Sequence, residues 1–153
     1  MLTRRERTEV LVESGSALAL ELASLVEADT PARDIVPAHQ GFVMCQVRET
    51  ARNSRFYLSE VLVTESRVRI GEADGLGVLM GTDAAHARAL AVIDAAYAMG
   101  QAPACMAELE RRIEEARVAV SERMAAQDAR TYVSRVEFDE MSGQDMSVQA
   151  VVK

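Results

Sequence analysis

The residues with the clearest chemical potential lie where a predicted strand turns into a predicted helix. Gly81 closes the strand, Asp83 stands where a helix N-cap is expected, and His86 occupies the third helical position. A histidine in this place can act as a general base or a ligand, mainly together with residues of another chain. A helical wheel, however, puts His86 on the apolar face of the helix. We therefore interpret it as a packed, hydrogen-bonded residue that fixes the helix start with Asp83, and we expect no catalytic residue in this chain.

The same helix start is a candidate anion site. Free backbone N–H groups and the helix dipole attract phosphate, but the Asp83 carboxylate already occupies that end and repels anions. The preceding Gly75-x-Gly77 lacks the third glycine of a dinucleotide motif, and the sequence has no Walker-type Gly-Lys-Thr. Cys45 and Cys105 are too few and too separated for a zinc site. We therefore expect this chain alone to bind neither a cofactor nor a metal.

Five arginines fall on or beside the predicted strands. Arg67 and Arg69 share one face of a strand, so they can contact an anion or pair with acidic side chains across an interface. The alternative is that these arginines are solvated and protect a sheet edge from aggregation. The other three are Arg48, Arg52 and Arg55.

The bulk composition restricts the classes of function. The chain has 153 residues, of which 49% are hydrophobic and 27% charged, as is typical of a single folded domain. The net charge is −7, and Lys153 is the only lysine among 17 basic residues. An acidic chain without a basic run has no electrostatic attraction to nucleic acid or to an anionic membrane. Neither a signal peptide nor a membrane-spanning apolar run is visible, so we expect a cytoplasmic protein with reduced cysteines.

Capping signals predict two short antiparallel helices at the N-terminal end. Thr3, followed three residues later by Glu6, forms a capping box that begins the first helix. Gly15 suits the left-handed position that ends this helix. Ser16 is then expected to cap the second helix.

Two further helices are predicted in the second half of the chain. One begins at Asp83 and ends at about Met99. The other covers about residues 103–128, and Glu108 and Arg112 are expected to form an ion pair on its exposed side. After Arg130 the pattern predicts extended chain, and the composition from Met141 onward predicts a flexible tail over residues 141–153.

Between residues 34 and 81 the periodicity changes from helical to extended. The connections are too short for parallel crossovers, so the strands are expected to form an antiparallel meander. The sequence therefore predicts an α+β fold with about four strands and about four helices, in a single domain over residues 1–140. The predicted strands cover residues 42–48, 55–64, 67–70 and 76–80, with residues 34–40 as a loop or an edge strand.

The alternation of apolar and polar residues in this sheet is poor. Val43, Cys45 and Val47 point to one face, whereas Phe42 and Met44 point to the other. A sheet with one solvated face is polar on that face, so both faces of this sheet are predicted to be covered. The chain's own helices are one candidate cover, and a partner subunit is the second.

Taken in order, these motifs resemble the PhnG family, the G subunit of bacterial carbon–phosphorus lyase. That family has a strand that closes in Gly-Arg-Asp, a helix that opens with His-Ala and carries a later Asp-Ala, and a late Ser-Arg-Val-Asp-Phe. The resemblance spans about residues 4–141. The matching positions, which it implies are structural or interface residues, are Phe56, Thr64, Gly81, Asp83, His86, Asp94, Ser134, Arg135, Val136 and Phe138.

The resemblance implies a small α+β subunit that assembles with H, I and J subunits. In this family the G, H and I subunits, helped by an ATPase-like L protein, are associated with the displacement of adenine from ATP by a phosphonate. The product is α-D-ribose 1-methylphosphonate 5-triphosphate, which the iron–sulfur J subunit cleaves. The I subunit is held to carry the glycosidic chemistry and the G subunit packs against it. The resemblance thus implies an accessory role without catalysis by this chain alone.

The sequence departs from the family pattern in three places. Residues 50–53 replace a Gly-Gly-Thr-Gly loop, residues 64–66 read Thr-Glu-Ser instead of Thr-Arg-Cys, and Thr82 replaces the arginine of Gly-Arg-Asp. Two alternatives therefore stay open. In one, the subunit handles nucleotide or phosphonate directly through His86, Asp83 and the arginines. In the other, the chain is a free-standing homodimeric module that binds a small ligand.

Overall fold

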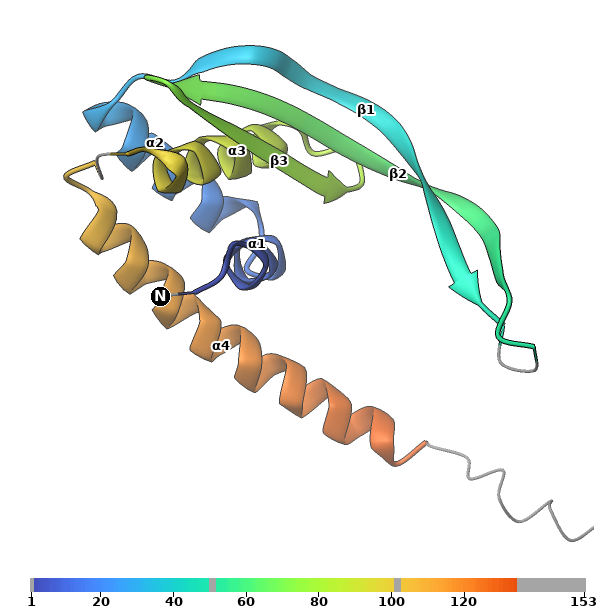
Figure 1. Cartoon of the computed structure of the whole chain (residues 1–153). Helices are drawn as coiled ribbons and strands as arrows, with labels where there is room; N and C mark the ends of the chain where they lie inside the picture. The colour runs from blue at the N-terminus through green and yellow to red at the C-terminus, as the bar shows by residue number, and fades with distance from the viewer. Residues whose placement is uncertain (1, 50–51, 101–102, 135–153) are drawn as a thin grey trace, which may run out of the picture. The chain divides into compact units, whose positions relative to one another are not determined.

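The computed structural model describes residues 2–49, 52–100 and 103–134 and has an α+β fold (Figure 1). The chain forms two compact units, residues 1–120 and 121–153. The predicted fold class is confirmed, with three strands in the described part instead of about four. The elements are α1 (Arg4–Glu13), α2 (Ser16–Asp29), β1 (Arg33–Arg48), β2 (Arg55–Ile70), β3 (Ala73–Met80), α3 (Ala84–Ala98) and α4 (Met106–Tyr132).

The first two helices follow from local capping. Thr3 Oγ1 accepts a hydrogen bond of 3.3 Å from the Glu6 backbone N–H, and the Glu6 carboxylate accepts one of 2.8 Å from the Thr3 N–H. The predicted capping box is therefore confirmed. Gly15 has a φ of +86° and turns the chain from α1 into α2. The prediction that Ser16 caps α2 is wrong, because Gly15 is the N-cap and no side chain bonds there.

The three strands form one antiparallel sheet in the order β1-β2-β3. The sequence predicted two strands, separated at Glu65 and Ser66, where the structure has the single strand β2. The physical reason is that Ser66 is buried, with its hydroxyl 3.5 Å from the Val36 carbonyl oxygen of β1, so this polar residue continues the sheet. Residues 34–40 belong to β1 and form the edge-strand alternative of the prediction.

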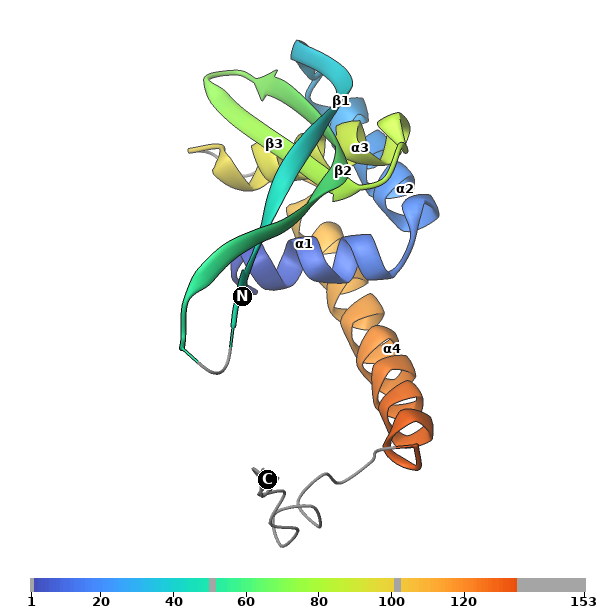
Figure 2. The ribbon, with the colours of Figure 1, turned by 90° about the vertical axis from the view of Figure 1, so that its right-hand side faces the viewer.

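The sheet continues beyond β3 as two strands only. β3 pairs with β2 from Val63 to Ile70. Farther along, β1 and β2 pair with each other alone and form a ribbon, which we define as residues 42–48 and 55–62. Figures 1 and 2 show this ribbon extending past the ends of β3 and α3.

Helix α3 lies close against β3 because neither backbone carries a large side chain at the contact. A Cβ atom added at Gly77 would lie 2.0 Å from the Ala87 carbonyl oxygen, and one added at Gly75 would lie 2.1 Å from the Ala91 carbonyl oxygen. Glycines of the strand therefore meet alanines of the helix, and backbone approaches backbone. This contact brings the apolar face of α3 onto the sheet.

The core lies on one face of the sheet. Alternate residues of β2 from Thr64 to Ile70 are buried, whereas the intervening Arg67 and Arg69 are exposed. The sequence suggested the chain's own helices or a partner subunit as covers for the sheet. The helices cover one face of the part of the sheet that contains β3. Large core side chains from these helices are Leu11, Leu22, Ile93, Leu109 and Ile113.

Helix α4 ends later than predicted. It continues to Tyr132, so the prediction of extended chain directly after Arg130 is wrong. The flexible tail predicted over residues 141–153 lies outside the described residues. Among the residues that the structure describes, no helix combines the length and the apolar character that crossing a bilayer requires.

The predicted ion pair of Glu108 and Arg112 does not form. Glu108 binds Arg111 at 2.6 Å, and Arg112 binds Glu21 of α2 at 2.5 Å. The prediction is wrong because Arg112 is within reach of α2, where an acidic residue of another helix competes with the local partner.

We expect Gly77→Ala to destabilise the protein by about 3 kcal/mol, the upper part of the range for overpacking, because the new methyl group meets backbone atoms that cannot rotate away. Gly41→Ala is the matched control, since a Cβ atom there meets nothing within 4 Å. Urea unfolding followed by circular dichroism measures both. Equal stability of the two variants would contradict the close contact of α3 with β3.

Candidate functional site

Several residues that the sequence singled out hold the turn from β3 into α3. Thr64 Oγ1 donates a hydrogen bond of 2.7 Å to the Gly81 carbonyl oxygen, and the Gly81 N–H donates one of 3.0 Å to the Leu62 carbonyl oxygen. Gly81 has a φ of +99°, which side-chain-bearing residues rarely adopt. Thr64 is buried. Both residues are therefore committed to the geometry of this turn.

Asp83 and His86 begin α3 in the predicted way. The Asp83 carboxylate accepts a hydrogen bond of 2.9 Å from the His86 backbone N–H, as an N-cap does. The His86 side chain is 4% exposed, and its Nε2 lies 3.3 Å from the Leu11 carbonyl oxygen in the last turn of α1. A carbonyl oxygen only accepts, so Nε2 carries the proton and donates. The Leu11 carbonyl lies in the last turn of α1, where backbone carbonyls have no hydrogen-bond partner within the helix, so the His86 side chain supplies one.

Asp94 is the centre of a charge cluster that joins α1, α3 and β3. Its carboxylate binds the Arg4 guanidinium at 2.6 and 2.8 Å and lies 3.5 Å from that of Arg7. It also accepts a hydrogen bond of 3.0 Å from the Leu76 N–H of the edge strand β3. Arg7 stacks on Tyr97, with 3.7 Å between guanidinium carbon and ring centroid. Burial lowers the pKa of Arg7, and the neighbouring Tyr97 and Asp94 oppose that shift.

Arg67 and Arg69 bind acidic neighbours on the exposed face of the sheet. Arg67 Nε lies 3.2 Å from the Glu65 carboxylate, and Arg69 Nε lies 2.5 Å from that of Asp74. The hydrogen bond from Arg69 lowers the pKa of Asp74. An external anion therefore has to compete with two carboxylates of the same chain for these arginines.

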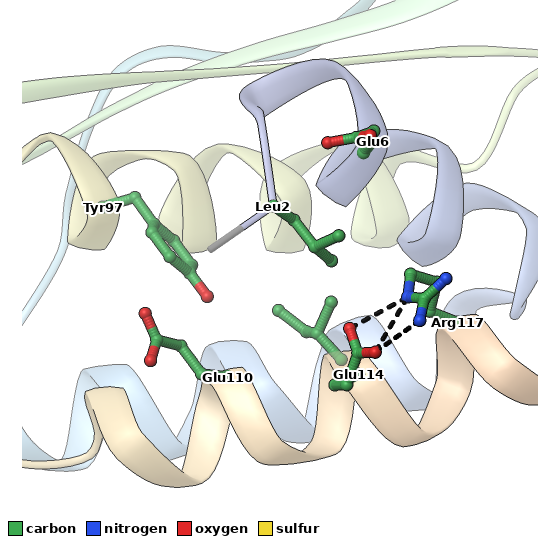
Figure 3. A pocket seen from close by; sticks show the side chains of 7 residues that line it. Leu2, Glu6, Tyr97, Glu110, Glu114 and Arg117 are labelled. Atoms are coloured by element: carbon green, nitrogen blue, oxygen red, sulfur yellow. Dashed lines mark hydrogen bonds and ion pairs between the residues drawn. The ribbon is translucent and has the colours of Figure 1, made fainter.

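A cleft of about 440 Å³ opens between α1, α3 and α4 (Figure 3). Tyr97 and Glu110 lie at one end of it, and Glu114 lies at the other, 2.5 Å from Arg117. Burial raises the pKa of Tyr97, so its hydroxyl stays protonated at neutral pH. Glu6 also lines the cleft, but its carboxylate is already bonded to the α1 cap. The cleft has the character of a seam between helices, because Glu114 and Arg117 bind each other and Glu6 binds the start of α1.

Phe56 differs from the matched residues of the turn, because it lies on the ribbon and is 45% exposed. Its neighbours on the ribbon are exposed as well. These are Phe42 (68%), Val43 (53%), Met44 (56%), Tyr57 (60%) and Leu58 (63%). Contiguous exposed apolar side chains mark surfaces that associate with other molecules. The poor alternation of the strands was the only sequence signal for this surface.

The remaining candidates lie apart from the turn and the ribbon. Ser134 Oγ donates a hydrogen bond of 2.7 Å to the Thr131 carbonyl oxygen at the end of α4, and residues 135–138 lie outside the described part of the chain. Burial raises the pKa of the Cys105 thiol, so little nucleophilic thiolate forms at neutral pH. Within residues 2–49, 52–100 and 103–134, no three His, Cys, Asp or Glu side chains are placed to hold a metal ion.

We expect Asp94→Ala to destabilise the protein by about 3 kcal/mol, because it leaves the buried Arg7 without its carboxylate. Asp74→Ala is the control, since it removes the same kind of partner from an exposed pair and is expected to leave the urea midpoint unchanged. Urea unfolding of both variants checks this. A small and equal effect of the two substitutions would show that the Asp94 cluster does not hold the helices and the strand together.

Comparison with known protein families places these features in context. The family model described as phosphonate metabolism protein PhnG matches residues 2–143, nearly the whole chain. A search of the curated proteins gave no significant match. The matched range includes the turn into α3, the Asp94 cluster and the ribbon. The chain therefore belongs to the PhnG family of phosphonate metabolism proteins.

Proposed function

We propose that this chain is an accessory subunit of the carbon–phosphorus lyase complex. In this role it supports the transfer of methylphosphonate onto the ribose 1-position of ATP with release of adenine, the reaction of an α-D-ribose 1-methylphosphonate 5-triphosphate synthase. Family membership supports this assignment. The chain packs against an I-type subunit, in an assembly that also contains H- and J-type subunits. The reactive groups belong to these companions, and this chain binds no cofactor by itself.

The hydrogen bonding of the candidate catalytic groups supports an accessory role. A general base must reach the proton that it removes. His86 is almost fully buried and directs Nε2 at the Leu11 carbonyl oxygen, while Asp83 caps the helix. Both groups form hydrogen bonds within the body of the subunit, which supports a structural role for them.

The exposed ribbon is the main structural support for the proposed role as a subunit. Six large apolar side chains on two paired strands are between 45% and 68% exposed. An isolated ribbon with unpaired edges and apolar side chains is prone to aggregation, so proteins cover or charge such edges. A subunit of a larger assembly meets this need by burying the ribbon against a neighbouring chain.

We expect the chain to co-purify with I-, H- and J-type subunits when they are expressed together, because the assembly buries the ribbon. Affinity capture followed by size-exclusion chromatography measures this. The isolated chain, given ATP and methylphosphonate, is expected to release no adenine. Turnover by the isolated chain, or failure to co-purify, would overturn the proposal. A homodimer that does not bind these subunits would favour the alternative that the chain is a free-standing binding module.

We expect His86→Ala to cost about 2 kcal/mol of stability, since it removes a buried side chain and its bond to α1, while kcat per assembled complex stays unchanged. His39→Ala is the matched control at an exposed position. Urea unfolding of the chain and adenine release by the complex measure the two effects. A fall in kcat in an intact complex would instead favour direct handling of nucleotide or phosphonate by this subunit.

A further inference from the structure

Both faces of the ribbon carry large apolar side chains, although Glu60, which pairs with Met44, lies on the face of Phe42. Residues paired across two strands point to the same face, and successive residues alternate. Phe42 pairs with Leu62 on one face, and Val43 pairs with Val61 on the other. A flat partner surface covers one face and leaves the other in water. A partner that buries both faces must therefore enclose the ribbon.

A bulge redistributes the aromatic side chains between these faces. Cys45 pairs with Ser59 and the next residue, Gln46, pairs with Tyr57, so Leu58 is an extra residue in β2. Tyr57 therefore joins the face of Phe42, and Phe56, which pairs with Val47, joins the face of Val43. Without the bulge, each of these two aromatic residues would lie on the opposite face. With the bulge, Phe42 and Tyr57 share one face, and Val43 and Phe56 share the other.

The end of the ribbon carries positive charge. Arg48 and Arg55 are directly opposite each other across the strands, and Arg52 lies in the connection between them. Like charges in such a pair repel. Residues 48–55 contain these three arginines and a single acidic residue, Glu49. The Glu49 carboxylate accepts hydrogen bonds from the Arg52 N–H at 2.7 Å and the Ser54 hydroxyl at 3.0 Å, and Arg48 donates to the Asn53 side chain at 3.3 Å. In a chain with a net charge of −7 this is a local reversal of sign.

A second copy of this chain does not fit as the occupant. Two ribbons that stack on each other cover only one face of each. The cleft of about 440 Å³ is lined largely by charged groups. A wider hollow between α2 and α4 is also partly charged, with Glu21, Glu108 and Arg112 in its lining. Neither of these hollows provides two apolar walls.

We infer that the ribbon inserts into a cleft of a different protein chain, which has apolar walls against both faces of the ribbon and carboxylates at its closed end. The walls receive Phe42 and Tyr57 on one side and Val43 and Phe56 on the other. The carboxylates pair with Arg48 and Arg55 and relieve their repulsion. This inference rests on the proposed function, because it specifies how the subunit meets its partner.

Thiol labelling in the reconstituted complex tests whether both faces are enclosed. Cys45 lies on the face of Val43, and a Met44→Cys substitution places a thiol on the face of Phe42. With Cys105 replaced by serine, Cys45 alone reports one face, and Met44→Cys in a Cys45→Ser background reports the other. Both thiols should react with a maleimide in the isolated chain, and both should react at least about tenfold more slowly in the complex. Labelling of either thiol at the rate of the isolated chain would overturn the inference.

Substitutions test the same contact by affinity. Phe42→Ser and Val43→Ser are each expected to weaken binding to the partner subunits at least about tenfold, as central apolar contacts do. Val118→Ser is the matched control, because this exposed valine lies on α4. Replacing Arg48 and Arg55 with glutamate reverses their charge and should slow association with the partner subunits. Added salt should reduce the difference in association rate between this variant and the wild type. If all ribbon variants bind the partner subunits with the affinity of the wild type, the inference is wrong and the proposed function still holds. If the wild-type chain itself does not assemble with them, both the inference and the proposed function are wrong.

Discussion

The close contact between the α3 and β3 backbones determines how α3 packs on the sheet. Gly75 and Gly77 leave no room for a side chain, so alanine-bearing turns of α3 rest on the strand itself. This contact sets where α3 lies, and the buried residues of β2 then meet a continuous apolar helix face. It also brings Asp94 within 3.0 Å of the Leu76 N–H, so a side chain of α3 satisfies a backbone group at the outer edge of the sheet.

The body and the ribbon differ in how fully their groups are satisfied. In the body, Thr64, His86 and Asp94 each bind a backbone group of another segment, and their hydrogen-bonding capacity is directed inward. The ribbon has the opposite character, because its large apolar side chains are exposed and two arginines face each other at its end. A self-contained body with an exposed apolar arm is the arrangement expected of a chain that associates with another molecule.

The caps at Thr3 and Asp83 could be predicted from the sequence, whereas the cap of α2 and the partners of Ser66 and Arg112 could not. The capping box at Thr3 and the N-cap at Asp83 depend only on residues within one helical turn, and both are correct. The break predicted near Ser66 failed because a polar residue in the middle of a strand has the same sequence signature whether it turns or is buried against another strand. The partner of Arg112 was also missed, since Glu21 is 91 positions away and enters its reach only through tertiary packing.

The ribbon is the part of the fold whose surroundings the sequence could predict only in part. Poor alternation correctly indicates that neither face of a sheet suits water, but it does not say which molecule provides the cover. The structure shows what covers the part of the sheet that contains β3. Helix α3 packs on β3 and the adjoining half of β2, and α2 packs on α3. The bulge at Leu58 then places Tyr57 on the face of Phe42 and Phe56 on the face of Val43, which the alternation within β2 alone could not show. A single partner that covers both faces must enclose the ribbon, and the repelling pair of Arg48 and Arg55 favours negative charge in that partner.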